Sequence, residues 1–249
     1  MKLKLISSLM FSIALSSMAF AETPSLPTAQ SSSSNTMSVF DSKIYEGLFG
    51  TKEMREIYND QRLISYWLKF EAALANAQAK HGLIPEEAAQ EISKACVLDN
   101  VDIQKLTEAT RKVGRPVDGL VKQLRALNPT VKAYIHLGST TQDVMDTATV
   151  LQMMDAIDVI EKQLTKLILR LADLSEKYKS TPMVSRTNGQ DAIPTTFGML
   201  TASYMAELNR NLSRMREAKE RSRVGQLGSA VGTLSSLGPK ALELSLIHI

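Results

Sequence analysis

Residues 139–181 read STTQDVMDTATVLQMMDAIDVIEKQLTKLILRLADLSEKYKST, a run of 43 positions without glycine or proline. This run predicts a single helix of about 40 residues, which would be about 60 Å long. Apolar side chains recur along one face of its second half in steps of four and three: Ile160, Leu164, Leu167, Leu171, Leu174 and Tyr178. So long an apolar seam needs other long helices to cover it, either from this chain or from another subunit.

The stretch 199–224 predicts the neighbouring helix, because it holds 26 residues without glycine or proline. One face of that helix carries Tyr204, Leu208, Leu212 and Met215. We expect the two helices to run antiparallel, joined by residues 182–194, as half of a helical bundle. Six basic residues between positions 210 and 223 are interleaved with glutamates, which favours a solvated helix face over a binding patch.

Shorter helices are expected before the long run. Residues 51–81 contain no glycine or proline and carry apolar side chains at helical spacing, which predicts one long helix with Trp67 as its core anchor. Three further segments each open with Pro or Asp in the first turn, at 85–95, 102–111 and 116–127. The sequence therefore predicts an all-α protein with a short-helix N-terminal domain, 39–135, and a partial central bundle of long helices, 136–249.

Composition narrows the class of protein. Of the 249 residues, 44% are hydrophobic and 22% charged, which is typical of a globular chain, and 12 glycines and 8 prolines are few for an all-β protein. Cys96 is the sole cysteine, which excludes an intrachain disulfide and a cysteine-based zinc cluster. Three histidines disfavour a histidine-rich metal site.

The N-terminal segment predicts export. Lys2 and Lys4 precede the mostly apolar run 5–18, and Ala19-Phe20-Ala21 matches a cleavage site, so we expect a signal peptide over 1–21 and a periplasmic or secreted protein. Residues 22–38 are rich in serine and proline and predict a flexible tether. The apolar run is too short for stable membrane insertion. Without the leader, 27 basic residues face 26 acidic ones, which gives no case for a nucleic-acid partner.

Residues 136–147, HLGSTTQDVMDT, form the first motif that could carry chemistry. Gly138 permits a close approach, and Thr140 or Thr141 can cap the long helix, whose first N–H groups and positive dipole end suit a carboxylate. The alternative is a routine helix cap, with Asp143 and Asp146 in the first turn.

Two other stretches offer polar groups. Residues 185–198, SRTNGQDAIPTTFG, connect the two long helices and supply many hydrogen-bond donors, although a well-bonded interhelical turn would look the same. Arg115 precedes Pro116 at a helix start, where it could reach an anionic ligand or cap the preceding turn.

The stretches 136–147 and 186–198 resemble the first two signature regions of the fumarase/aspartase superfamily, in the branch of adenylosuccinate lyase and 3-carboxy-cis,cis-muconate cycloisomerase. The likeness extends over residues 39 to about 240. It implies a homotetramer with a core of long helices, active sites shared between subunits, and no metal or organic cofactor. It also implies a lyase or cycloisomerase that acts on a small di- or tricarboxylate, by β-elimination that often releases fumarate or by lactonising cyclisation.

The resemblance also implies site residues. His136 and Asn188 take the catalytic positions. Eight residues take substrate-binding positions: Arg115, Ser139, Thr140, Thr141, Gln142, Arg186, Thr187 and Gln190.

The chain departs from the superfamily pattern at Asn188, at the third signature, and at Arg115, which stands where adenylosuccinate lyases tend to have histidine. Asn188 stands where lyases with a poor leaving group have histidine, and an amide cannot act as a general acid near neutral pH. This fits an amine leaving group or a cyclisation, and an exported enzyme is badly placed for purine synthesis, so adenylosuccinate is set aside as substrate. The third signature, a loop with the catalytic serine, is absent, and Ser235 and Ser236 lack its context.

We therefore expect an N-terminal fragment of a lyase that is inactive alone. The alternative is a catalytically inactive helical oligomer that binds a carboxylate or serves as a scaffold. A weaker alternative is an export-linked helical adaptor, which rests on the serine-rich tether.

Overall fold

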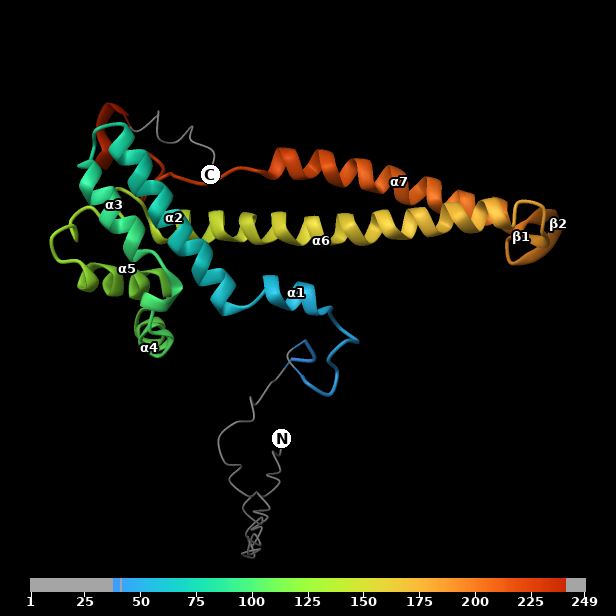
Figure 1. Ribbon diagram of the computed structural model, residues 1–249, viewed down its shortest axis with the longest axis horizontal. Coiled ribbons are helices and arrows are strands. Elements are labelled where there is room, and N and C mark those ends of the chain that lie inside the picture. The colour runs from blue at the N-terminus through green and yellow to red at the C-terminus, as the bar shows by residue number, and fades with distance from the viewer. Residues whose placement is uncertain (1–37, 41, 241–249) are drawn as a thin grey trace, which may run out of the picture. The chain divides into compact units, whose positions relative to one another are not determined.

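The computed structural model describes residues 38–40 and 42–240 of the chain (Figure 1). The chain divides into two compact units, Met1–Phe49 and Gly50–Ile249. In the first unit, the ring of Phe49 packs edge to face against Phe40 and Tyr45, with ring centroids 6.3 and 6.0 Å apart. The expected signal peptide and nearly all of the expected tether lie outside the described residues.

The second unit is helical, as the sequence predicts. Its shorter helices are α1 (Lys52–Ile57), α2 (Asp60–Lys80), α3 (Glu86–Ala95), η1 (Leu98–Asn100), α4 (Ile103–Val113) and α5 (Pro116–Leu127). The later elements are α6 (Thr141–Lys177), β1 (Pro182–Thr187), β2 (Gln190–Thr196), α7 (Phe197–Ser222) and η2 (Ser235–Lys240). None of the described helices is long and apolar enough to cross a membrane.

The single helix expected over 51–81 is wrong, because the chain breaks between α1 and α2. Asn59 explains the break. Its side-chain oxygen accepts from the N–H of Arg62 at 2.8 Å and so caps α2, while its amide nitrogen donates to the carbonyls of Arg55 and Glu56 at 3.0 and 2.9 Å and closes α1. One side chain thus satisfies one N–H group of α2 and two carbonyl groups of α1, which offsets part of the cost of breaking the helix.

The core of the second unit lies where α2 meets α3, α5 and the first part of α6. Trp67 is buried there, as expected. The buried cluster that contains Trp67 also includes Leu68, Phe70, Leu74, Ile92, Val117, Leu120, Leu124, Val144 and Ala148. Deletion of such side chains typically costs about 2–5 kcal/mol, so this cluster fixes the start of α6 against the short helices.

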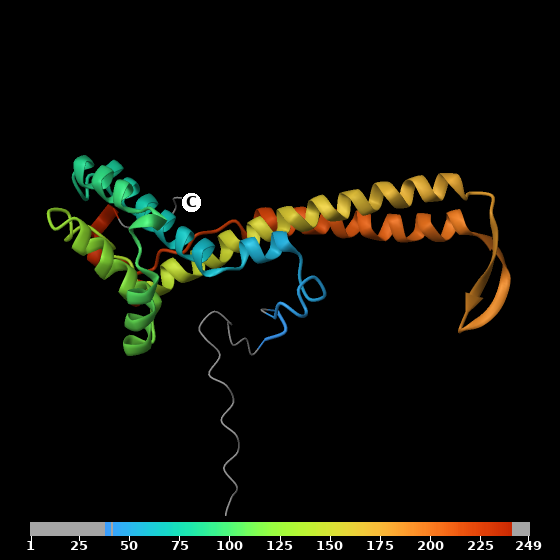
Figure 2. The ribbon, with the colours of Figure 1, turned by 60° about the horizontal axis from the view of Figure 1, so that its bottom comes forward.

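Helices α6 and α7 lie side by side and antiparallel (Figures 1 and 2). Arg216 pairs with Glu161 at 2.7 Å, and Lys219 pairs with Asp158, so part of the basic run contacts α6, although the Arg216 side chain remains 56% exposed. The far half of the α6 seam stays partly open: Ile160 is 42% exposed and Leu167 is 47% exposed. One neighbouring helix is therefore not enough to cover it.

The connection between the long helices is a β-hairpin, which the sequence analysis missed. Strands β1 and β2 pair antiparallel, from Pro182 opposite Thr196 to Thr187 opposite Gln190, with an irregularity near Val184. Asn188 and Gly189 form the turn, with φ of 49° and 74°. Two successive positive φ values suit a tight two-residue hairpin turn, for which Asn-Gly is the favoured pair.

Candidate functional site

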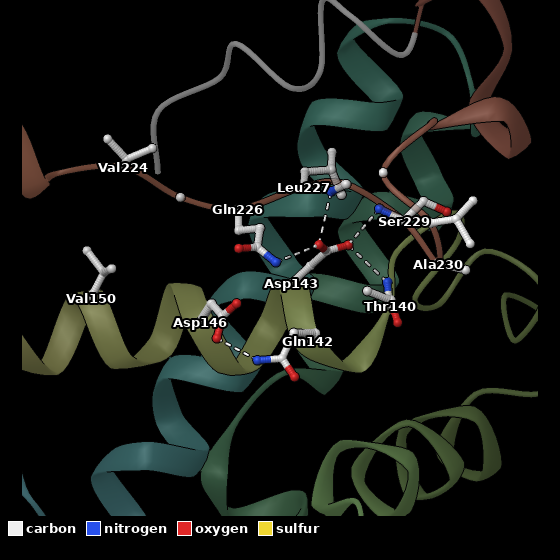
Figure 3. Close-up of a pocket in the computed structure, with 14 residues that line it drawn as sticks. Thr140, Gln142, Asp143, Asp146, Val150, Val224, Gln226, Leu227, Ser229 and Ala230 are labelled. Atoms are coloured by element: carbon white, nitrogen blue, oxygen red, sulfur yellow. Dashed lines mark hydrogen bonds between the residues drawn. The ribbon is translucent and has the colours of Figure 1, made fainter.

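The start of α6 is built around a buried carboxylate. Asp143 lies in the first turn of α6, and its Oδ2 accepts from the N–H of Thr140, the N-cap residue, at 3.0 Å. The same carboxylate accepts from the N–H groups of Gly228 and Ser229 at 2.9 and 3.0 Å (Figure 3). One side chain therefore joins the start of α6 to the segment 224–232, here called the late segment, which follows more than 80 residues later. The sequence pattern alone indicates no more for Asp143 than a place in a routine helix cap.

A second hydrogen bond ties the same segment to α6. The hydroxyl of Thr147, one turn after Asp143, accepts from the N–H of Gln226 at 2.9 Å. Ser229 itself has φ of 64°, a left-handed conformation that costs free energy for a residue with a side chain. Hydrogen bonds to Asp143 and Thr147 thus hold the late segment on α6, although the backbone of Ser229 is strained.

Between α6 and this late segment lies an open pocket of about 710 Å³ (Figure 3). Its walls are the outward face of the first turns of α6 and the segment 224–232. Two of the predicted substrate-binding residues, Thr140 and Gln142, line it together with Asp146. The Gln142 amide donates to the Asp146 carboxylate at 2.6 Å, which orients its carbonyl group.

The loop before α6 is anchored by side chains from two other helices. Arg125 of α5 donates to the carbonyl of Ile135 at 2.9 Å, and Gln78 of α2 donates to the carbonyl of Leu137 at 2.7 Å. At Gly138, φ is 69° and Leu237 occupies the space that a Cβ atom would need, so only glycine fits. The loop that presents His136 is therefore fixed by its surroundings.

His136 is the most constrained of the predicted site residues. Its φ of 61° is left-handed, and its Nδ1 lies 2.6 Å from Oε1 of Glu71 on α2. The Glu71 side chain is 1% exposed and that of His136 13%. The sequence analysis missed Glu71. The helical pattern places this residue on the buried face of α2, but it gives no sign that its carboxylate contacts His136.

The remaining predicted residues lie elsewhere. Ser139 and Thr141 flank the N-cap and are partly buried. Arg115 is exposed at the start of α5 and faces Asp118 at 3.6 Å. The second motif lies on the hairpin, where four exposed residues are Arg186, Thr187, Asn188 and Gln190.

The two motifs are at opposite ends of α6. With 37 residues at 1.5 Å per residue, α6 separates them by about 55 Å. One copy of the chain therefore does not bring His136 and Thr141 together with Arg186 and Asn188. Among the residues described, no three His, Cys, Asp or Glu side chains gather in a way that could hold a metal ion.

Comparison with known proteins identifies relatives that all point to one family. A family model described as lyase matches residues 49–245. Adenylosuccinate lyase of Methanocaldococcus jannaschii is 41% identical over 79% of this chain and 43% of its own length. For 3-carboxy-cis,cis-muconate cycloisomerase of Pseudomonas putida, identity is 38% over 82% of this chain and 49% of the relative.

A solved structure agrees with these matches. The crystal structure of fumarate lyase from Mesorhizobium sp. BNC1 has a TM-score of 0.75 and 40% identity, and the match covers 77% of this chain and 45% of that one. The chain thus spans slightly less than half the length of the relatives it matches. The family model covers most of the chain, including the stretches that hold both motifs, and the solved relative shares the fold, so the chain belongs to the lyase family of the fumarase/aspartase superfamily.

Proposed function

We propose that this protein is a lyase or cycloisomerase that acts on a di- or tricarboxylate, either by β-elimination or by lactonising cyclisation. The relatives support this substrate class, because adenylosuccinate and 3-carboxy-cis,cis-muconate both carry several carboxylates. Elimination would often release fumarate.

The observation that carries the proposal is the pocket at the start of α6. Thr140 and Gln142 line it, and Ser139 and Thr141 stand beside them. The first N–H groups of an α-helix have no acceptor within the helix and carry a partial positive charge, which suits a carboxylate. A substrate carboxylate bound there would be stabilised further as charge develops on it during proton removal.

Asn188 limits the chemistry at the second motif. An amide donates and accepts hydrogen bonds but does not transfer a proton at neutral pH. We therefore assign to Asn188, Arg186, Thr187 and Gln190 the orientation of the substrate, and favour an amine leaving group or a cyclisation. Arg115 is a further anion contact in this proposal.

The proposed active site needs more than one copy of the chain. The distance of about 55 Å between the motifs and the exposed half of the α6 seam both support shared sites in a homotetramer. Export through a cleaved signal peptide is part of the same proposal, and the leader sequence supports it.

The direct test is turnover by the complete gene product. Fumarate-releasing succinyl adducts and carboxymuconates are supplied, and near-ultraviolet absorbance follows the change in conjugation. We expect turnover of at least one compound by a tetramer, with the oligomeric state measured by light scattering. Failure of a folded tetramer to convert any such acid contradicts the proposal.

A matched pair of variants tests the carboxylate contact. We expect Thr141→Ala to weaken the binding of fumarate about tenfold, which corresponds to the loss of one charge-assisted hydrogen bond. Thr149→Ala removes an exposed threonine hydroxyl two turns further along α6 and should leave affinity unchanged. Unchanged affinity in both variants would refute the assignment.

Tight fumarate binding without turnover of any acid would instead favour the alternative function, an inactive carboxylate-binding scaffold.

A further inference from the structure

A carboxylate lies buried directly beneath the loop that presents His136. Oε1 of Glu71 is 2.6 Å from Nδ1 of the imidazole, and the side chain is almost inaccessible to solvent. Within the described residues, its other oxygen, Oε2, has no hydrogen-bond partner. A buried carboxylate is costly unless it is paired, and here the imidazole is the group that pairs with it.

The opposite nitrogen of the ring is differently placed. Among the described residues, His136 makes its one hydrogen bond through Nδ1, and Nε2 is not one of the buried polar atoms that lack a partner. The ring is therefore anchored through Nδ1, and its side chain is 13% exposed. His136 does not itself line the pocket at the start of α6, but it lies four residues before Thr140, which does.

The other titratable groups near the pair do not compete for its proton. Burial, with a further contribution from the charge of Glu71, raises the pKa of the Cys96 thiol to about 12, so the thiol stays protonated at neutral pH. Arg125 is permanently charged and donates to the carbonyl of Ile135. Asp143 is occupied by backbone N–H groups of Thr140, Gly228 and Ser229.

We propose that Glu71 is a positioning residue that holds His136 with its proton on Nδ1, so that Nε2 is the atom that exchanges a proton with a bound carboxylate ligand. The hydrogen bond at one imidazole nitrogen determines which nitrogen carries the proton, and so which one faces the ligand. The ligand part of this inference rests on the function proposed above, whereas the positioning part rests on the geometry of the pair alone.

Proton transfer between the ligand and His136 breaks one bond and forms another. The lone pair of Nε2 forms the new N–H bond, the O–H bond of the ligand's carboxyl group breaks, and its electrons stay on that oxygen as a carboxylate. The imidazolium that results is paired with the Glu71 carboxylate, and the reverse step returns the proton. Such a pair supplies proton-transfer chemistry that Asn188 cannot.

Nuclear magnetic resonance of the ¹⁵N-labelled whole chain tests the positioning. The chain has three histidines, and the signals of His136 are those lost in His136→Gln. We expect the nitrogen signals to show the proton of the neutral imidazole on Nδ1 and none on Nε2. Glu71→Gln should keep the proton on Nδ1, because its amide oxygen still accepts, whereas Glu71→Ala should move it to Nε2.

A matched control separates this effect from the loss of a charge. Glu91→Gln also neutralises a helical glutamate, one whose described partners are Lys94 and Asn128, and should leave the His136 signals unchanged. An Nε2–H form in the wild-type chain, or a Glu71→Ala spectrum identical to the wild type in a chain that keeps its fold, overturns the proposal.

Fumarate binding tests the exchange with a ligand. Calorimetry in buffers of different ionisation enthalpy should show uptake of about one proton by the wild-type chain and by Glu91→Gln, and clearly less by Glu71→Gln, which has no charge to pair with the imidazolium. Equal uptake in Glu71→Gln contradicts the role of the pair in proton exchange. If no carboxylate binds while Nδ1 is protonated as expected, the proposed substrate class fails and the positioning stands.

Discussion

The two motif regions of this chain are held in opposite ways. The region 136–147 is fixed by the buried Gln78 side chain of α2, by the Arg125 side chain of α5, and by Gly228 and Ser229 of the late segment, whose N–H groups donate to Asp143. The hairpin at 182–196 is held by its own strand ladder, and most of its side chains face solvent. One chain therefore fixes the conformation of region 136–147 by itself, whereas most side chains of the hairpin stay exposed to solvent.

Removal of the Asp143 carboxylate should have the largest effect. Asp143→Ala leaves the N–H groups of Thr140, Gly228 and Ser229 without their acceptor, and we expect a loss of about 3–5 kcal/mol in the free energy of unfolding. Denaturant unfolding followed by circular dichroism measures it. Asp146→Ala, which removes one bond to Gln142, should cost less than about 1 kcal/mol, and equal losses would show that Asp143 does not anchor the loop.

The base of the hairpin offers the next test. A Cβ atom on Gly198 would lie 2.5 Å from the carbonyl oxygen of Ser175 and 2.6 Å from the Cα of Lys179, so α6 and α7 would have to separate. We expect Gly198→Ala to cost about 1–3 kcal/mol in thermal or denaturant unfolding. Ser203→Ala, at an exposed site on α7, serves as the control and should be nearly neutral.

The turn of the hairpin should respond less. Asn188 has φ of 49°, so Asn188→Ala should cost about 1 kcal/mol, whereas Asn188→Gly, which adopts this conformation freely, should cost nothing. Unfolding free energies of the two variants decide this. Equal losses would mean that the Asn188 side chain, and not its backbone, stabilises the turn.

Arg186 should have the smallest effect on stability. Its contact with Asp191 is 3.5 Å long, and the two side chains are 75% and 77% exposed, so Arg186→Ala should change the free energy of unfolding by less than about 0.5 kcal/mol. Under the proposed function, the same variant lowers kcat/KM of the complete gene product at least about tenfold. Arg170→Ala, another exposed arginine, is the control for both measurements, and an unchanged kcat/KM would remove Arg186 from the site.

Local patterns explain which elements could be foreseen. The glycine- and proline-free runs gave α6 and α7 nearly to their ends, because helix propensity and periodicity act over neighbouring residues. The Asn188-Gly189 pair is an equally local signal, which favours a hairpin over the irregular polar connection expected from the sequence. The break at Asn59 was missed because it depends on side-chain bonds to both adjoining helices.

The sequence by itself determined the all-α class, the two long helices, the family motifs and a helix cap at Thr140 or Thr141, since each depends on residues close together in the chain. Only the tertiary structure decided that Asp143 binds Gly228 and Ser229, and that Glu71 lies against His136, 65 positions away. Such contacts arise from the packing of α2 and the late segment against the start of α6, and periodicity within one helix does not specify which distant polar group meets which.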